Sequence, residues 1–596
     1  MQSLEEKYKE NRVIRMTYIF CLVFPMFIDI GFGWRHFSSI IDGYLSDPDS
    51  YMRLLRIRQG IDHGTLLNYV MRDDSGHPLI IEWSRLYDAV ILFLASPLTV
   101  FMPVMTAVKT AGILATPLWS GLTAVAIAYG VQPFCKNKSA LVFAGICIGL
   151  MPGIFRINAF GTIQYHMFLA CVMTWAIAFA GRVIYNQNNN EDVTIMSLAS
   201  GLVGGLAIWA MPETWPFILC SYAALVWLDE PTKKSLIPLK WTTGFLIATS
   251  IGAIIDPPSV FIEYDRISIV YVWLSLLLFM GAFLRSLIVP VFHNFIEKLV
   301  LFVIPMIFCL IWFVVWPNII KGPWGLTTPQ DFKLFFGSAV ETLPPSNFWM
   351  GLSLAGPGIW AAIYCLWLVV QAAKKHDWNT MGAASIGWIA CLFAAGLTLR
   401  FQLFSAFSSI AGAAIIPLLI SYGIDKGDNL KGALTRISYG LLGVVPFLAL
   451  FPMAAQGHAH KAKIDFPIKQ CRLTKGAAHL IDIAGRSIVL APIDRVPAIL
   501  YNTETTGVGS IYQHGISHYV EAVKAWQSKS MTGAVPESVI KTKAKYIAFC
   551  ADVPPPGATP KTLWANLAHG KVPTWLTEVG TSGNWSLYRI KNFKSE

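Results

Sequence analysis

The chain has 596 residues, of which 55% are hydrophobic and only 14% are charged. In a typical soluble domain about a quarter of the residues are charged, so this composition excludes an ordinary soluble protein. The net charge of +11 does not indicate nucleic-acid binding, because the Lys and Arg residues cluster in short loops between apolar segments. The apolar residues occur in blocks of about 20, the length that a helix needs to cross the hydrocarbon, which predicts a polytopic α-helical membrane protein.

Residues 1–15 are polar and basic, and no small-residue cleavage site follows the next apolar run, so we expect a retained first helix with a cytoplasmic N-terminus. The run Ala89–Val108 is ambiguous. As a full span it gives fourteen helices, and as a membrane-dipping helix of a long external loop it gives thirteen. We expect thirteen, because the basic loops at Lys136, Lys233 and Lys374 then lie inside. The expected spans lie near residues 16–34, 109–131, 139–155, 163–184, 194–211, 214–229, 241–256, 266–288, 296–317, 347–371, 380–398, 403–423 and 435–455.

Residues 1–455 therefore form the expected transmembrane domain, with a long first external loop at 35–108 and a fifth external loop at 318–346. Residues 456–596 have more charge and short β-rich runs, Ser487–Ala491 and Tyr546–Cys550, beside a helical stretch, Ile516–Gln527. This pattern predicts an external, periplasmic α/β domain that is long enough to form its own hydrophobic core. The tail holds Cys471 and Cys550, and the sequence leaves open whether they pair.

Two aspartates, Asp47 and Asp49, open a first-loop helix in which Leu54, Leu55 and Ile57 alternate with Arg53, Arg56 and Arg58. The alternation predicts an amphipathic helix. Either aspartate suits an N-cap, and both together suit a metal ion or a phosphate-bearing ligand.

Other polar residues fall on the same external face, and each has a structural and a functional interpretation. Trp83 and Arg85 suit either the bilayer interface or a ligand, and Glu213 suits either helix capping or a site. His166, at a helix start, is either a core residue or a ligand, and Arg400 either snorkels to the interface or binds an anion. Glu341 lies in the loop Ser338–Pro344 between two long apolar segments.

These stretches resemble the membrane glycosyltransferases with the GT-C fold, and within them the catalytic subunit of the oligosaccharyltransferases. Asp49-Ser50-Tyr51 is similar to the acidic motif of the family's first loop, and Phe160–His166 takes the place of its second-loop Asp-x-Asp/Glu motif. Ser338-Ala339-Val340-Glu341 resembles the Ser-Val-x-Glu of the fifth external loop, and Leu399-Arg400-Phe401 resembles the characteristic arginine segment. In order and topology the resemblance covers roughly residues 15–455.

The chain departs from the family at two motifs. Gln164 and His166 stand where acidic metal ligands are expected, and both bind a hard divalent cation less well than carboxylate does. The resemblance therefore predicts either a metal-independent enzyme or weakened binding of Mg or Mn by Asp47, Asp49 and His166. The tail has Ala491–Val496 where oligosaccharyltransferases carry a Trp-Trp-Asp motif that reads the acceptor sequon, which leaves an asparagine acceptor unsupported.

Transfer from a lipid-linked donor needs a cation for the leaving phosphate and a carboxylate for the acceptor's proton. We expect Asp49 as base or acceptor-orienting residue with Asp47 beside it, and Glu341 closing over the site. Arg400, assisted by His166, would bind the donor phosphate. The expected acceptor or loop contacts are Arg53, Trp83, Arg85 and Glu213.

The sequence thus predicts a cell-envelope glycosyltransferase in the inner (plasma) membrane. Its expected partners are membrane lipids, a polyprenyl-phosphate-linked sugar donor and a glycolipid or polysaccharide acceptor, and no nucleic acid. The alternatives are oligosaccharyltransferase-type protein glycosylation, a non-catalytic partner and a transporter. A transporter is disfavoured because the sequence has no half-to-half repeat.

Overall fold

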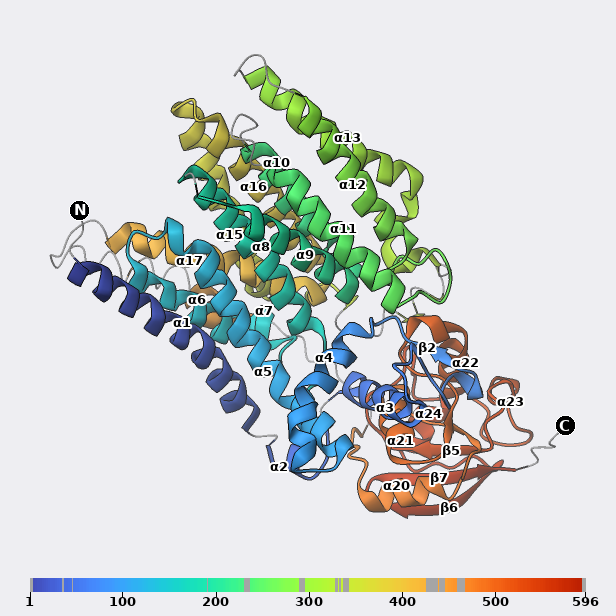
Figure 1. The fold of residues 1–596 in the computed structure, drawn as a ribbon. Coiled ribbons are helices and arrows are strands. Elements are labelled where there is room, and N and C mark those ends of the chain that lie inside the picture. The colour runs from blue at the N-terminus through green and yellow to red at the C-terminus, as the bar shows by residue number, and fades with distance from the viewer. Residues whose placement is uncertain are drawn as a thin grey trace.

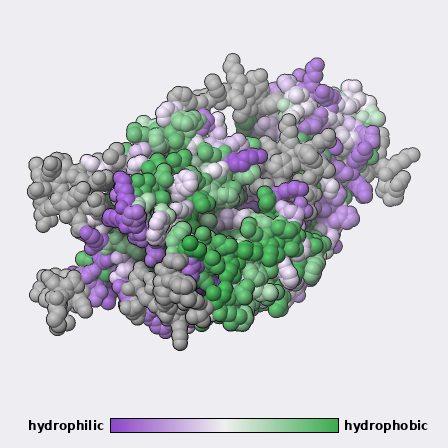
Figure 2. Space-filling view, turned by 90° about the horizontal axis from the view of Figure 1, so that it is seen from above, coloured by the Kyte–Doolittle hydropathy of each residue, from purple (hydrophilic) through white to green (hydrophobic). Residues whose placement is uncertain are grey.

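The structure is a computed structural model that describes most of the chain. The described residues are 4–34, 37–45, 47–189, 191–229, 236–288, 295–326, 331, 334–335, 342–424, 438, 445–457 and 467–591. A bundle of long helices forms one end of the molecule and a small sheet domain forms the other, with the first external loop between them (Figure 1). A broad hydrophobic surface separates two more hydrophilic ends (Figure 2).

The bundle agrees with a polytopic membrane protein. Among the described residues, nine helices are long and apolar enough to cross a membrane. They belong to the elements α1 (Leu4–Gly33), α5 (Val104–Val131), α8 (His166–Asn188), α11 (Ile237–Ile255), α12 (Ile269–Leu287), α13 (Phe295–Val315), α15 (Phe348–Lys374), α16 (Trp378–Arg400) and α17 (Ser405–Ile424). Each coincides with an expected span.

The other four expected spans are shorter or only partly described. Three correspond to α6 (Val142–Leu150) with α7 (Pro152–Phe155), to α9 (Thr194–Ala210) and to α10 (Trp215–Leu228). The fourth, 435–455, is described only at residue 438 and from residue 445 onward, where it contains a π-helical turn (Pro446–Leu450) and the start of α19 (Phe451–Gly457). Short 3₁₀ turns link several helices, at Gln132–Phe134, Lys138–Leu141, Pro212–Thr214, Pro317–Leu326 and Gln402–Phe404.

The ambiguous run Ala89–Val108 is not one continuous span. It is divided between α4 (Leu86–Ala95), a 3₁₀ turn (Ser96–Val100) and the start of α5 at Val104. A helix the length of α4 reaches about 15 Å, roughly half the hydrocarbon thickness. The structure therefore divides the run, and the count of thirteen spans stays a prediction.

The rest of the first external loop contains α2 (Phe37–Ile41), α3 (Pro48–His63), a 3₁₀ turn (Asp74–Gly76) and a two-stranded antiparallel sheet of β1 (Tyr69–Val70) and β2 (Leu79–Ile80). Figure 1 shows α3 enclosed between the bundle and the tail. The amphipathic prediction for α3 is wrong, because Arg53 and Arg56 are as buried as Leu54 and Leu55 on the other side.

The tail is the expected α/β domain. Its sheet has the order β4-β3-β5-β7-β6, in which β3 runs parallel to β4 and β5 and the other neighbours are antiparallel. The strands are β3 (Ile488–Leu490), β4 (Thr506–Gly507), β5 (Tyr546–Phe549), β6 (Leu576–Ser582) and β7 (Trp585–Ile590). The helices are α20 (Lys475–Asp482), α21 (Val496–Asn502), α22 (Ile516–Trp526), α23 (Glu537–Lys541) and α24 (Leu563–Ala568), with 3₁₀ turns at Ile493–Arg495 and Gln513–Gly515. A disulfide joins Cys471 to Cys550, which answers the question that the sequence left open.

The tail is tied to the membrane domain by polar contacts. The guanidinium of Arg72 donates to the carbonyls of Leu500, Thr503 and Thr505 at 2.7–3.0 Å. His518 contacts Asp74 at 2.5 Å, from a nitrogen of its ring. These contacts fix the first loop against the tail, so neither can shift without the other.

A second group of contacts involves acidic side chains, and it joins the tail to the loop before α12. Asp265, in the loop before α12, accepts hydrogen bonds from Gln513 and from His514, the latter at 2.9 Å. Burial lowers the pKa of His514. The hydrogen bond to Asp265 and the negative charges of Asp265, Glu82 and Glu263 outweigh this effect, so the pKa of His514 is raised overall. Burial raises the pKa of Glu82 to about 7, and burial with the charges of Asp265 and Glu82 raises that of Glu213 to about 7.

Raising the pH is therefore expected to destabilise this junction. Glu82 and Glu213 titrate near pH 7 in the folded protein. In an unfolded chain a glutamate titrates near about 4.3, so between these values the folded chain holds more protons. The stability from these protons is complete below pH of about 4 and is lost as the pH rises through 7. His514 has the same sign, since its folded pKa is also raised.

Thermal unfolding of the purified protein from pH 5 to 8 measures this effect. The Tm should fall with pH, and the double variant Glu82→Gln/Glu213→Gln should have a flatter dependence than the wild type. An equally steep dependence in the double variant would contradict this assignment.

Candidate active site

The N-terminus of α3 carries the two candidate carboxylates. Asp47 is the N-cap: its side chain accepts from the Ser50 backbone N–H at 2.8 Å and from the Ser50 hydroxyl at 2.6 Å. Asp49 lies in the first turn of the helix. Backbone N–H groups and the helix dipole favour negative charge here, which explains how two carboxylates can lie so close together. The capping interpretation of Asp47 is confirmed, and it leaves a ligand-binding role open.

The second external loop lies against the start of α3. The Ile163 backbone N–H donates to the Ser50 hydroxyl at 2.6 Å, and the Gln164 amide donates to Asp47 at 3.4 Å. Burial raises the pKa of Asp47, although the hydrogen bonds of Ser50 and Gln164 and the charge of Arg53 act in the opposite direction. His166 is the first residue of α8, is buried and lies with its ring centroid 4.3 Å from that of Tyr165. The structure thus joins the first-loop and second-loop motifs, as their resemblance to the family implies.

The tail contributes a residue to the same place. The Tyr512 hydroxyl donates to Asp49 at 3.0 Å across a separation of 463 residues. Tyr512 is buried and packs edge-on against Trp83, with ring centroids 5.2 Å apart. The sequence analysis missed Tyr512, because no local pattern marks a tyrosine whose partner lies at the opposite end of the chain.

Arg53 and Arg56 form the support beneath the carboxylates. Both pair with Asp88, Arg53 at 2.5 Å and Arg56 at 2.7 Å, and all three side chains are about 1% exposed. Arg53 also donates to the Ile163 carbonyl at 3.1 Å and lies 4.6 Å above the Trp83 ring. These contacts occupy Arg53 and Trp83 inside the protein, so their expected contact with an acceptor stays a prediction.

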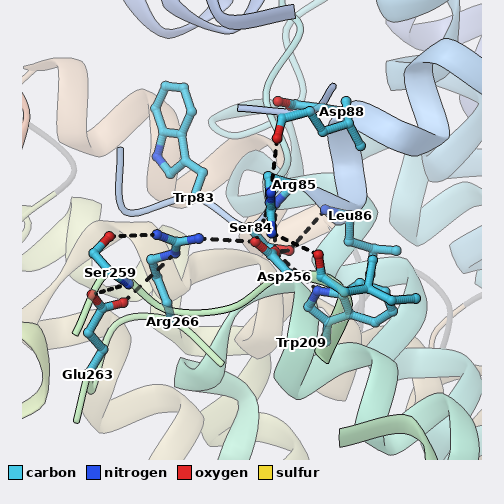
Figure 3. Close-up of polar contacts among 12 residues, drawn as sticks. Trp83, Ser84, Arg85, Leu86, Asp88, Trp209, Asp256, Ser259, Glu263 and Arg266 are labelled. Carbon is cyan, nitrogen blue, oxygen red and sulfur yellow. Dashed lines mark hydrogen bonds and ion pairs between the residues drawn. The ribbon is translucent and has the colours of Figure 1, made fainter. Parts of the chain in front are cut away.

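Arg85 belongs to a second buried cluster, centred on Asp256 at the end of α11 (Figure 3). Arg85 contacts Asp256 at 2.7 Å and Arg266 contacts it at 3.0 Å. Ser84 and Trp209 donate to the other carboxylate oxygen at 2.9 and 3.1 Å. The cluster connects the first loop to α9, α11 and the segment before α12, and it pairs Arg85 with Asp256, so the expected contact of Arg85 with an acceptor stays a prediction.

Three other expected site residues lie apart from this cluster or outside the described residues. Glu213 lies in the 3₁₀ turn before α10, where its charge interacts with those of Asp265 and Glu82. Arg400 is exposed at the end of α16, with its guanidinium 4.5 Å above the Phe401 ring. Gln402 beside it donates to the carbonyl of Pro344 at 2.9 Å, so the end of the fifth external loop touches this segment. Glu341 itself lies outside the described residues.

The expected metal set does not form a closed site. Within the described ranges, no three His, Cys, Asp or Glu side chains gather as a group that could hold a metal ion. Asp47 and Asp49 remain as a pair of carboxylates on one helix turn. Mg²⁺ is commonly held by one or two protein carboxylates together with phosphate oxygens and waters, so this donor set fits a cation shared with a phosphate-bearing substrate.

Comparisons with known proteins place the fold. No family model and no curated protein matches the sequence. The structure is similar to the archaeal oligosaccharyltransferase AglB of Archaeoglobus fulgidus in complex with an inhibitory peptide and a dolichol-phosphate, with a TM-score of 0.64 and 10% identity over 92% of this chain and 70% of that one. It is also similar to the apo form of the same organism's oligosaccharyltransferase, with a TM-score of 0.66 and 13% identity over the same shares.

A third similar structure is that enzyme tethered to an acceptor peptide containing the NVT sequon, with a TM-score of 0.62 and 11% identity over 89% of this chain and 69% of that one. A fourth is its complex with Zn and sulfate, with a TM-score of 0.58 and 10% identity over 89% of this chain and 67% of that one. The chain therefore has the GT-C fold of the oligosaccharyltransferases, as the order of its motifs implied.

Proposed function

We propose that the chain is a membrane glycosyltransferase that moves a sugar from a polyprenyl-phosphate-linked donor to a glycolipid or polysaccharide acceptor. The observation that carries the proposal is the pair Asp47 and Asp49 at the start of α3, held by Gln164 of the second loop and Tyr512 of the tail. In a chain with the GT-C fold, this is the place where the resemblance predicts the chemistry.

Asp49 is the proposed base or acceptor-orienting residue. An acceptor hydroxyl must lose its proton as it attacks the anomeric carbon, and a positioned carboxylate accelerates such a step by about 100-fold or more. Tyr512, which donates to Asp49, orients the carboxylate. Asp47 is the neighbouring carboxylate, and its raised pKa makes it a better proton acceptor than an exposed aspartate.

The donor side is proposed from residues that the sequence singled out. Arg400 is exposed at the outer end of α16 and offers a planar cation for the leaving phosphate. His166 would assist as a hydrogen-bond donor, and Glu341 would close over the site with the fifth loop. A divalent cation at Asp47 and Asp49, when bound, would neutralise charge on that phosphate.

The membrane orientation is part of the proposal. The disulfide between Cys471 and Cys550 supports a tail outside the cytoplasm, because disulfides persist in oxidising compartments. The N-terminus and the basic loops would then lie in the cytoplasm and the tail in the periplasm.

Two alternatives remain in view. Protein glycosylation is favoured by the structural similarity to oligosaccharyltransferases, one of them tethered to a sequon peptide. A non-catalytic partner is favoured by Gln164, whose amide replaces an acidic side chain beside Asp47.

The first prediction separates an enzyme from a non-catalytic partner. Asp49→Asn keeps the size of the side chain and removes its charge, so sugar transfer should fall by about 100-fold or more, the usual contribution of a general base. Glu341→Gln should also lower transfer. Asp62→Asn, an exposed position on the same helix, is the matched control and should leave the rate unchanged. Transfer in reconstituted vesicles measures the rates, and normal turnover of Asp49→Asn would refute this site.

The second prediction concerns the cation. Gln164→Asp adds a carboxylate beside Asp47 and should tighten Mg²⁺ or Mn²⁺ binding while transfer is retained, since carboxylate oxygens are the ligands that these ions prefer. Gln164→Glu is the longer control. Isothermal titration with the metal, beside transfer assays, measures both properties. Complete and reversible loss of wild-type transfer at low chelator concentration would show that the wild type already binds its cation tightly.

The third prediction concerns the acceptor. Discrimination for Asn-x-Ser/Thr needs a buried polar partner for the hydroxyl, and the Trp-Trp-Asp motif is absent from the tail. The purified protein should therefore glycosylate a lipid or saccharide acceptor and leave sequon peptides unmodified. Mass spectrometry of both acceptors checks this. Modification of a sequon peptide that is lost when its Ser or Thr is replaced by Ala would establish the oligosaccharyltransferase alternative instead.

A further inference from the structure

Two adjoining pockets lie along the seam between the first external loop and the tail. Their volumes are about 210 and 470 Å³, and they share Tyr44, Tyr51 and Leu473 as lining residues. One is bounded by α2 and the start of the tail, and the other by α20 and the start of α5. Because they share walls, we treat them as one groove, the seam groove.

The seam groove is rich in positive charge. Lys109, Arg472, Lys475 and Arg495 line it, against two carboxylates, Asp42 and Asp482. Arg495 is paired with Asp552, and Asp482 accepts from the backbone of Glu504. Within the described part of the chain, Lys109, Arg472 and Lys475 have no ion-pair or side-chain hydrogen-bond partner. Three cations are thus available to one ligand.

Gly43 lines the groove beside one of these cations, Lys109. Its φ is +98°, a conformation that other residues rarely adopt, and a Cβ built there would lie 3.6 Å from the Lys109 ammonium. A side chain at this position would strain the backbone, and its Cβ would lie in ordinary van der Waals contact with the ammonium group. Lys109 is half-buried beside Gly43, whereas Arg472 and Lys475 are exposed.

Exposed apolar and aromatic side chains lie in the segments next to the groove. Lys109 stands shortly after the start of α5 at Val104, and the preceding residues Val100 and Phe101 are 78% and 83% exposed. Trp34, at the end of α1, is 65% exposed near α2. Exposed aromatic and apolar side chains at the end of a membrane helix mark the interface between hydrocarbon and water. Figure 1 shows α2 and α20 at this same end of the bundle.

We propose that the seam groove binds the anionic head group of a membrane glycolipid. This inference rests on the proposed function, and it identifies the acceptor as a phosphate- or carboxylate-bearing lipid. Lys109, Arg472 and Lys475 bind the anion. Tyr44 and Tyr501 offer ring faces to the sugar. Tyr51 lines the groove from the first turns of α3, the helix whose first turn also carries Asp49, so the groove and that carboxylate share one helix.

A matched pair of variants at Ala478, which lines the groove on α20, tests the charge alone. Ala478→Glu and Ala478→Gln add the same volume, and only the first repels an anion. The full-length protein in detergent is titrated with fluorescent phosphatidylinositol at low ionic strength. A charged hydrogen bond is worth a factor of about ten or more in affinity, so Ala478→Glu should bind at least tenfold more weakly than Ala478→Gln.

A second variant removes the cations themselves. Lys109→Gln/Arg472→Gln/Lys475→Gln should also lose about tenfold or more in affinity, whereas Lys524→Gln, an exposed lysine on α22, should bind as the wild type does. Equal Tm values among the variants show that all of them fold. Equal affinity of Ala478→Glu and Ala478→Gln, together with unchanged affinity of the triple variant, would overturn the groove as a binding site. Equally tight binding of soluble inositol phosphate would overturn the assignment to a lipid.

Transfer assays separate this inference from the proposed function. Asp49→Asn should lose transfer and keep phosphatidylinositol binding. Ala478→Glu should lose binding and also transfer to an anionic glycolipid, while transfer to an uncharged glycolipid should be equal in Ala478→Glu and Ala478→Gln. Weak binding with undiminished transfer to the anionic glycolipid would show that the bound lipid is not the acceptor. Intact binding in a chain without any transfer activity would overturn the proposed function alone.

Discussion

Two buried carboxylates, Asp88 and Asp256, hold the first loop in place, and the geometry around Asp47 and Asp49 depends on them. Each pairs with two arginines, Asp88 with Arg53 and Arg56 and Asp256 with Arg85 and Arg266. Removing one partner from such a buried group leaves a charge without compensation, which typically costs about 3–5 kcal/mol. Arginine suits this role because its planar fork can bind a carboxylate, a carbonyl and an aromatic face at once.

This arrangement explains how a loop of more than 60 residues can hold Asp47 and Asp49 in fixed positions. Long loops are usually mobile, and a carboxylate on a mobile loop has no fixed relation to a substrate. Here Arg53 bonds the Ile163 carbonyl while Ser50 accepts from the Ile163 N–H, so α3 is fixed to the second loop on both sides. Asp47 and Asp49, at the start of α3, are therefore also held in place. The tail adds a further contact, the hydrogen bond from the Tyr512 hydroxyl to Asp49.

The fold was largely predictable because its signals are local. Runs of about 20 apolar residues identify spans without reference to anything distant, and the β-rich runs at Ser487–Ala491 and Tyr546–Cys550 contain the strands Ile488–Leu490 and Tyr546–Phe549. Asp47 and Asp49 were both candidate N-caps of the first-loop helix, and the structure shows Asp47 as the cap.

The site was predictable only in part, because its partners are distant in sequence. Arg53 and Arg56 looked like the polar face of an amphipathic helix, since nothing local shows that Asp88 neutralises both. The contact of Tyr512 with Asp49 had no local signal at all. Arg400 was recognised by its place in a motif, but a sequence does not specify that its guanidinium rests over Phe401.

The bond from Tyr512 to Asp49 also has a consequence for the order in which the protein is made. Its two ends are separated by 463 residues, and ribosomes add about 5–20 residues per second, so α3 exists for roughly half a minute or longer before its partner is synthesised. Throughout that interval the carboxylates of the first loop lack the hydroxyl that orients Asp49. The contacts around Asp49 are thus complete only after the tail has been synthesised and has folded. A nascent or truncated chain would carry both aspartates and still lack the finished geometry around them.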